Sequence, residues 1–151
     1  MKINNAFLAN HAETREGLAF ISGGFPEWYT VPSLPITAPL AAVWVLELEQ
    51  AEIGLPFTFE LAVVYPSRLK HLLAHVGVGR SHDTRTVEGA PLYVIVTYVF
   101  GVEFQVEGLH TFEVVSENQV MATMPLFVNL EARGGTEEAE AEDLASRFKF
   151  G

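Results

Sequence analysis

The sequence contains no cysteine. Disulfides, thiol catalysis, cysteine-bound zinc and iron–sulfur sites are therefore excluded. A chain without cysteine suits a reducing compartment, and we expect a cytoplasmic protein, or a virion protein if a phage encodes it. With 151 residues, of which 49% are hydrophobic, the chain fits one domain that buries a core without covalent staples.

Basic residues are also scarce, since 9 Lys and Arg stand against 19 Asp and Glu, for a formal net charge of −10. The few bases are scattered and form no stripe, so we expect no nucleic-acid partner.

Long apolar runs are missing too. No window approaches the roughly 20 apolar residues of a membrane helix. The N-terminal MKINNAFLANHAE lacks the apolar run of a signal peptide, so we expect no membrane partner.

Short apolar stretches with period-2 alternation are abundant. Residues 57–63, FTFELAV, alternate cleanly, which is typical of a strand with one buried face. Residues 92–100, LYVIVTYVF, are apolar throughout, which predicts a central strand covered on both sides. Further strands are expected at 41–49 and in two hairpins, of which one joins 3–9 to 17–22 across NHAETRE and the other joins 110–115 to 120–128 across SENQ.

These segments predict an all-β fold, an antiparallel β-sandwich of about seven to eight strands over residues 1–133. Residues 67–80, SRLKHLLAHVGVGR, fit a helix or a strand, and the glycines together with the Pro66-Ser67 turn favour the strand. We expect the core to be carried by ten residues: Phe7, Phe20, Trp44, Leu46, Phe59, Leu61, Val94, Val96, Phe112 and Phe127.

The stretch SGGFPEWYTVPSLPITAPL, residues 22–40, holds four of the eight prolines. Proline donates no backbone hydrogen bond, so this stretch is not expected in the middle of a sheet. We interpret it as a crossover along the sandwich edge, in which prolines shield the edge and apolar side chains such as Trp28 and Val31 reach the interior. The alternative is an exposed aromatic patch around Trp28 that binds a partner.

The C-terminal segment 134–151 has a different composition. Gly134-Gly135 precedes TEEAEAEDLASRFKFG, in which acids come before bases, the order that a helix dipole favours. We expect a hinged, acidic, amphipathic helical tail, ordered only if Leu144, Phe148 and Phe150 dock on an apolar surface. That surface belongs to the same chain or, as we favour, to a neighbouring subunit, so that the tail mediates self-association.

The order of these features resembles a family of small bacterial and phage all-β domains of unknown function. The resemblance covers residues 3–128 and rests on AFLANHAE, GLAFISGGF, the proline-marked SLPITAPLAAVWVLEL and the pair GLHTFEVV and MPLFV. His110 stands where the family has an aromatic residue. These motifs are turns, core positions and strand ends, so the resemblance implies a fold and no site.

Candidate chemistry is sparse. His71 and His75, with His82 and Asp83, offer imidazole and carboxylate ligands for a metal, but the HExxH pattern is absent and edge or surface histidines are the simpler interpretation. His11 with Glu13 and Glu16 occupies a predicted polar hairpin loop, where solvated carboxylates are the norm. We therefore expect no catalytic residue, no metal and no cofactor.

Three function hypotheses follow. The first is a non-catalytic protein-interaction module whose partner-binding residues are Trp28 and the tail residues. The second is a structural accessory component of a phage capsid or tail. The third is a metal-dependent enzyme or sugar binder that uses His71, His75 and His82 or the aromatic side chains.

Overall fold

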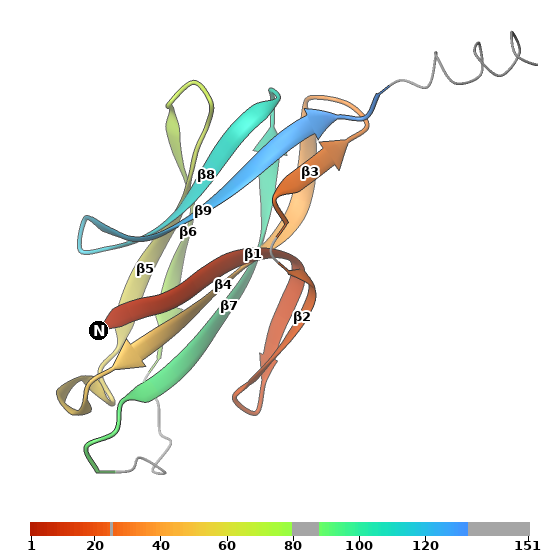
Figure 1. The fold of residues 1–151 in the computed structure, drawn as a ribbon. Coiled ribbons are helices and arrows are strands. Elements are labelled where there is room, and N and C mark those ends of the chain that lie inside the picture. Colours follow the sequence, from red (N-terminus) through yellow and green to blue (C-terminus); the bar gives the residue numbers. More distant parts are fainter. Residues whose placement is uncertain (25, 80–87, 133–151) are drawn as a thin grey trace, which may run out of the picture.

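The computed structural model describes residues 1–24, 26–79 and 88–132, which form two β-sheets with one short 3₁₀ turn, η1 (Gln50–Glu52) (Figure 1). The fold is all-β, as predicted. Its strands are β1 (Lys2–Arg15), β2 (Leu18–Gly24), β3 (Trp28–Val31), β4 (Ile36–Leu48), β5 (Phe57–Val64), β6 (Lys70–Val78), β7 (Leu92–Phe104), β8 (Gly108–Ser116) and β9 (Gln119–Leu130).

The first sheet has four strands in the order β2-β1-β4-β7, and the second has five in the order β3-β9-β8-β5-β6. All strand pairs in the described residues are antiparallel except β3 with β9, which run parallel. The expectation of a purely antiparallel fold is corrected at this one pair. It was missed because β3 lies inside the proline-rich stretch that the sequence marked as a connection.

Two hairpins close with two-residue turns in which both residues have positive φ. The turn between β8 and β9 has Glu117 at 51° and Asn118 at 62°, and the turn between β1 and β2 has Glu16 at 52° and Gly17 at 77°. Such turns match the twist of the strands that they join. The β8–β9 hairpin was predicted correctly. The loop predicted over NHAETRE was wrong, because β1 continues through it to Arg15.

The main core lies between the two sheets. Trp44 of β4 packs edge-on against Phe59 of β5 with ring centroids 5.7 Å apart, and Phe100 of β7 meets Phe112 of β8 at the same distance. Of the predicted core residues, seven are buried and Val94 is half-buried; the seven are Phe7, Trp44, Leu46, Phe59, Leu61, Val96 and Phe112. The alternation from 57 to 63 therefore had the correct register.

Two of the predicted core residues were wrong. Phe20 is 51% exposed and Phe127 is 37% exposed. Phe127 alternates along β9 with the buried Leu126 and Val128, so its side chain lies on the outer face. Phe20 lies on the β1–β2 hairpin, away from the main core.

Strand β7 is the edge of the four-stranded sheet, which corrects the prediction of a central strand. Its even-numbered residues face the main core. Its outer face approaches the β1–β2 hairpin, where Thr97 Oγ1 lies 3.0 Å from Thr14 Oγ1. This partial cover on both faces explains the apolar sequence of β7, which among the described strands is hydrogen-bonded to β4 alone.

A second, smaller core lies on the outer face of the four-stranded sheet. It joins residues of β1 and β4, with Ile95 of β7 packed against them: Phe7, Ala9, Ala12, Ala41 and Val43. Strand β1 pairs with β4 up to Ala9 and with β2 from Ala9 onward, so that the end of the β1–β2 hairpin extends beyond the pairing with β4 (Figure 1). The outward apolar residues of β1 and β4 are thus buried within the protein's own fold.

The proline-rich stretch does cross between the sheets, as predicted, but it also crosses back. After β2 in the four-stranded sheet, β3 joins the edge of the five-stranded sheet, and β4 returns to the first. Val31 is buried as expected. Pro39 lies within β4, contrary to the expectation. The pairing of β4 with β1 ends at Ala41, so Pro39 has no partner on the β1 side and pairs with β7 alone. Its missing N–H therefore faces no neighbouring strand.

Residues 70–78 form a strand, which confirms the preferred interpretation of 67–80. Phe25, His82, Asp83 and the whole segment 134–151 lie outside the described residues. The predicted C-terminal helix therefore remains a prediction. Within the described residues, no helix has the length and apolarity to cross a membrane.

Candidate partner-binding surfaces

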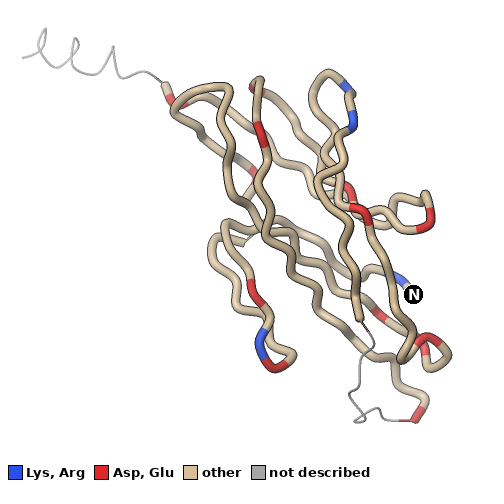
Figure 2. The backbone as a smooth tube through the Cα atoms, turned by 180° about the vertical axis from the view of Figure 1, so that it is seen from behind, with Lys and Arg blue, Asp and Glu red and all other residues tan. Residues whose placement is uncertain are grey.

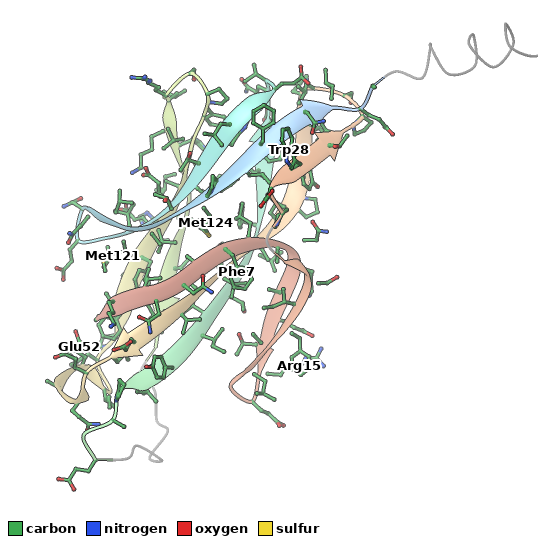
Figure 3. The ribbon with its side chains drawn as sticks, in the orientation of Figure 1. Phe7, Arg15, Trp28, Glu52, Met121 and Met124 are labelled. Atoms are coloured by element: carbon green, nitrogen blue, oxygen red, sulfur yellow. The ribbon has the colours of Figure 1, made fainter. Side chains whose placement is uncertain are left out.

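An apolar row crosses three strands on the outer face of the five-stranded sheet. Trp28 of β3 is paired with Phe127 of β9, and Phe127 is paired with Leu109 of β8. The rings of Trp28 and Phe127 have centroids 4.6 Å apart. Trp28 is 61% exposed and Leu109 is 52% exposed, so most of this row is open to solvent. Figure 3 shows Trp28 beside the C-terminal part of β9.

Pro125, two residues before Phe127 on the same face, is also exposed. We name Trp28, Leu109, Pro125 and Phe127 the Trp28 surface. The sheet places these side chains outward because the residues between them, such as Leu126 and His110, fill the core. The predicted burial of Trp28 was therefore wrong, and the alternative, an exposed aromatic patch, is what the structure has. Phe127 and Leu109 were missed as surface residues.

A small apolar cavity of about 190 Å³ adjoins the Trp28 surface. It is lined by Phe7 and Leu8 of β1, Met124 and Pro125 of β9, and the connecting residues Pro26 and Glu27. Pro125 belongs to both features. The cavity has room for an apolar side chain next to the exposed aromatic rings.

Carboxylates surround the Trp28 surface. Glu27 precedes Trp28, Glu107 accepts a hydrogen bond from the Leu130 backbone N–H at 2.7 Å, and Glu131 follows β9. Within the described residues, none of these three carboxylates forms an ion pair with Lys or Arg. Figure 2 shows acidic positions over both sheets and few basic ones. A cationic group is therefore favoured at the rim of this surface.

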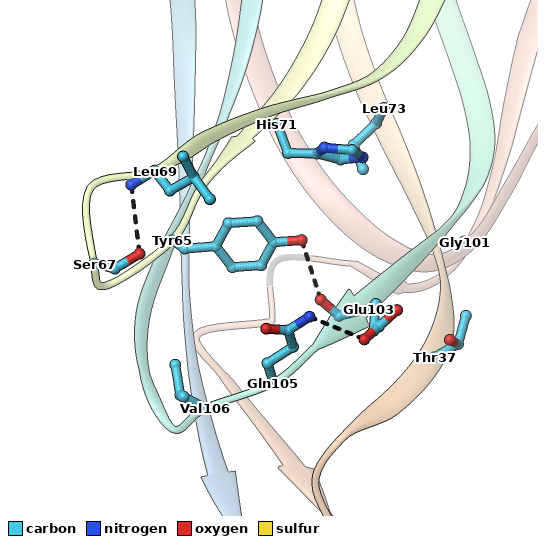
Figure 4. A pocket seen from close by; sticks show the side chains of 10 residues that line it. All are labelled: Thr37, Tyr65, Ser67, Leu69, His71, Leu73, Gly101, Glu103, Gln105 and Val106. Atoms are coloured by element: carbon cyan, nitrogen blue, oxygen red, sulfur yellow. Dashed lines mark hydrogen bonds between the residues drawn. The ribbon is translucent and has the colours of Figure 1, made fainter.

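A groove of about 600 Å³ lies where β6 and β7, the free edges of the two sheets, come together. Tyr65 occupies its centre, between the β5–β6 turn, which carries Leu69, and the end of β7 (Figure 4). The Tyr65 hydroxyl donates to the Glu103 carbonyl at 3.2 Å, and Gln105 donates to the Glu103 carboxylate at 3.1 Å. Burial, and then the nearby Glu103 charge, raises the pKa of the Tyr65 hydroxyl.

Hydroxyl, imidazole and carboxylate groups line the groove at Ser67, His71 and Glu103. Its polar side chains at Tyr65 and Gln105 are already bonded to Glu103, and His71 is its single imidazole. No nucleophile is paired with a base among the residues that line it.

The two candidate metal ligands of β6 lie on opposite faces of the sheet. His71 pairs with the buried Val63 and therefore faces inward, whereas His75 pairs with the exposed Glu60 and faces outward. A register shift between Leu61 and Ala62 separates the two pairs. Residues four apart share a face in a regular strand, so the bulge, which the sequence does not reveal, is what separates these two histidines. Within residues 1–24, 26–79 and 88–132, no cluster of three metal-binding side chains occurs.

His11 and Glu13 lie in strand β1 and not in a loop, and Glu16 is in the turn that follows. Glu13 forms an exposed ion pair with Arg15 at 2.9 Å. The three residues therefore form no enclosed carboxylate pair.

His110 is fully buried. Its Nδ1 lies 3.0 Å from the Gly108 carbonyl, and its Nε2 has no partner among the described residues. The ring packs edge-on against Phe104, with centroids 5.0 Å apart, and against Tyr65, at 5.6 Å. Burial lowers the pKa of His110, and the hydrogen bond to Gly108 opposes part of this shift. The imidazole thus occupies a core position between the aromatic rings of Phe104 and Tyr65, and burial favours its neutral form.

The model of a family described as "Family of unknown function (DUF6941)" matches residues 4–129. The chain belongs to this family. The match spans all of the described strands but for their extreme ends, in agreement with the resemblance drawn from the sequence motifs. No curated protein sequence matches the chain.

Solved structures offer distant likenesses. A β-glucosidase from Listeria innocua has a TM-score of 0.42 at 12% identity, over 83% of this chain and 16% of its own. The DNA glycosylase AlkC from Pseudomonas fluorescens has a TM-score of 0.37 at 11% identity, over 69% of this chain and 28% of its own. An immunoglobulin-like protein from Pseudomonas aeruginosa has a TM-score of 0.33 at 17% identity, over 85% of this chain and 95% of its own. The chain spans less than a third of the first two proteins, and none of the three carries a functional assignment to it.

Proposed function

We propose that this DUF6941 protein is a non-catalytic interaction module built on a β-sandwich, and that the Trp28 surface receives a protein partner. The observation that carries the proposal is the row of Trp28, Phe127 and Leu109 exposed on a rigid sheet. Tryptophan and other large aromatics dominate the binding energy of protein interfaces. A contiguous exposed apolar row of this kind marks a candidate interaction site.

The surroundings of the surface define the kind of partner. An apolar centre is flanked by the carboxylates of Glu27, Glu107 and Glu131. A complementary partner therefore has an apolar or aromatic anchor and Lys or Arg around it. The cavity beside Pro125 has room for one such anchor.

The candidate chemical groups support a non-catalytic role. His71 and His75 face opposite sides of the sheet, and His110 is sealed among aromatic rings. The groove at Tyr65 holds no paired acid, base and nucleophile among its described residues. Apolar recognition is the activity that the exposed side chains can provide.

The test is capture of proteins from the native host cells with the full chain as bait. The double variant Trp28→Ser, Phe127→Ser removes the aromatic row. The matched control, Leu18→Ser, Phe20→Ser, removes two comparably exposed apolar side chains from the β1–β2 hairpin. We expect a specific partner to be retained by the wild type and the control and lost by the first variant. Equal retention by all three proteins would contradict the proposal.

A further inference from the structure

The Trp28 surface has a candidate occupant within the same chain. On the four-stranded sheet, the outward residues around Phe7 are buried, whereas on the five-stranded sheet Trp28 and Phe127 are exposed. The segment after β9 contains Leu144, Phe148 and Phe150, which lie outside the described residues. An exposed aromatic row and an aromatic segment of the same chain are complementary apolar surfaces.

We propose that residues 144–150 of the same chain cover the Trp28 surface and compete there with the partner. This inference rests on the proposed function, since it assigns a regulator to the same site. Phe148 and Phe150 contact the aromatic row, and a partner gains access by displacing them. The module thus carries its own reversible cover.

The length of the chain permits this contact. Phe127 lies beside Trp28, and the described chain ends at Ala132, roughly 17 Å further along at about 3.4 Å per residue. Because β3 and β9 run parallel, the chain leaves in the direction away from Trp28 and has to reverse. Gly134 and Gly135 can adopt turn conformations without steric cost. Residues 133–146 span up to about 45 Å when extended, which exceeds the return distance.

Charge complementarity favours the end of the segment. Phe148 and Phe150 alternate with Arg147 and Lys149, in the sequence Arg-Phe-Lys-Phe. The rim of the Trp28 surface carries Glu27, Glu107 and Glu131, none of which pairs with a base in the described part of the chain. The segment therefore brings cations to unpaired carboxylates together with aromatic rings for the apolar row.

An intramolecular cover is favoured over docking on a second copy. A tether of this length holds its end at an effective concentration in the millimolar range, far above the concentration of a second molecule. Even a weak contact with a millimolar dissociation constant then covers about half of the molecules. Partner proteins of higher affinity can still displace it.

Tryptophan fluorescence tests the cover in the full-length protein. The chain has two tryptophans, of which Trp44 is fully buried and Trp28 is exposed in the described structure. Acrylamide quenching therefore reports mainly on Trp28, and a Trp28→Phe variant defines the background. We expect Phe148→Ser, Phe150→Ser to raise the Trp28 quenching constant about twofold and to shift its emission to longer wavelength. The control Leu18→Ser, Phe20→Ser leaves both unchanged.

Charge reversal and dilution sharpen the test. Arg147→Glu, Lys149→Glu is expected to raise quenching in the same direction, and added salt to weaken the cover of the wild type. The wild-type quenching constant stays the same between about 1 and 100 µM, because the contact is intramolecular. Protection that emerges only at high concentration, together with a dimer in light scattering, would assign the segment to a second copy and overturn the proposal. Identical quenching of wild type and Phe148→Ser, Phe150→Ser would overturn it as well.

Partner capture separates this proposal from the proposed function. With both correct, Phe148→Ser, Phe150→Ser retains more partner than the wild type. If quenching is unaffected by the variant while capture still depends on Trp28, the cover is wrong and the interaction module stands. If quenching responds but capture is independent of Trp28, the cover stands as a purely intramolecular contact, and the partner site and the competition with it are wrong.

Discussion

The outer faces of the two sheets both carry apolar side chains, but the solvent exposure of these side chains differs. On the four-stranded sheet, Ala41 is 0% exposed and Val43 is 1% exposed, and both belong to the small core shared with Phe7. On the five-stranded sheet, the rings of Trp28 and Phe127 contact each other at an interplanar angle of 53° and stay open to solvent. The apolar side chains around Phe7 are thus buried within the fold, although Tyr93 and Val99 of the same sheet stay exposed, whereas the row of Trp28 and Phe127 is open to solvent.

The difference indicates that the two regions have different roles, one in stability and the other in binding. The small core around Phe7 stabilises the fold, whereas the Trp28 surface is the site at which we propose that a partner binds. If this comparison is right, mutations that remove apolar side chains cost stability on one sheet and binding on the other. The predictions below test that separation.

The largest effect is expected in the main core. Phe59 is fully buried and packs edge-on against Trp44, so Phe59→Ala leaves a cavity and costs about 3–5 kcal/mol of unfolding free energy. Chemical denaturation of the variant and the wild type measures this loss. A wild-type-like midpoint would show that the inner face of β5 is not where the main core lies.

A smaller loss is expected in the second core. Phe7 is 9% exposed and packs with Ala41 and Val43. We expect Phe7→Ala to cost about 2 kcal/mol, as for the loss of a mostly buried apolar side chain. Thermal unfolding compares it with Phe20→Ala, which removes an exposed ring from the β1–β2 hairpin and should change stability little. Equal losses in the two variants would contradict the closure of this face.

The stability of the wild type should depend on His110 at mildly acidic pH. Burial lowers the pKa of His110 below its ordinary value of 6.5, so the unfolded chain takes up a proton more readily than the folded one. The stability that this difference provides is present above pH 6.5 and is lost as the pH falls below it. His110→Phe removes the dependence and the unpartnered Nε2.

The unfolding free energy of His110→Phe relative to that of the wild type should therefore increase as the pH falls from about 7.5 to 5.5, by at most about 1.4 kcal/mol for each pH unit. Melting temperatures across this range measure it. A constant difference between His110→Phe and the wild type would show that His110 is not held neutral by burial.

The smallest effect on stability is expected at the Trp28 surface. Trp28→Ser and Leu109→Ser should each change the unfolding free energy by no more than about 0.5 kcal/mol, because the side chains are largely exposed. Denaturation midpoints check this against Phe59→Ala. A loss comparable to that of Phe59→Ala would make Trp28 a structural residue and remove the basis for the proposed function.

Local patterns predicted much of this fold. Strict alternation located β5, and the polar turn Glu117-Asn118 located the β8–β9 hairpin. Strand neighbours could not be predicted, because the order of strands in a sheet depends on contacts between residues far apart in the chain. The edge position of β7 and the parallel pairing of β3 are failures of this kind.

The candidate site was half predicted. Trp28 was identified as a possible partner-binding residue because the proline-rich stretch 22–40 is too apolar for an ordinary solvated loop, which left an exposed aromatic patch as the alternative. Phe127 was assigned to the core, since MPLFV does not show which of its apolar residues face inward until the pairing with β8 is known. Leu109 carried no signal apart from its place next to His110. The bulge in β6 that separates His71 from His75 was equally invisible.

Hydroxyl-radical footprinting of the captured complex tests the central claim most directly, because it reports the solvent access of individual side chains. The account predicts that partner binding lowers the oxidation of Trp28, Phe127 and Leu109, while Phe20 and Tyr93, which are exposed elsewhere, are oxidised as in the free protein. Protection of Phe20 or Tyr93 with unchanged oxidation of Trp28 and Phe127 would contradict it.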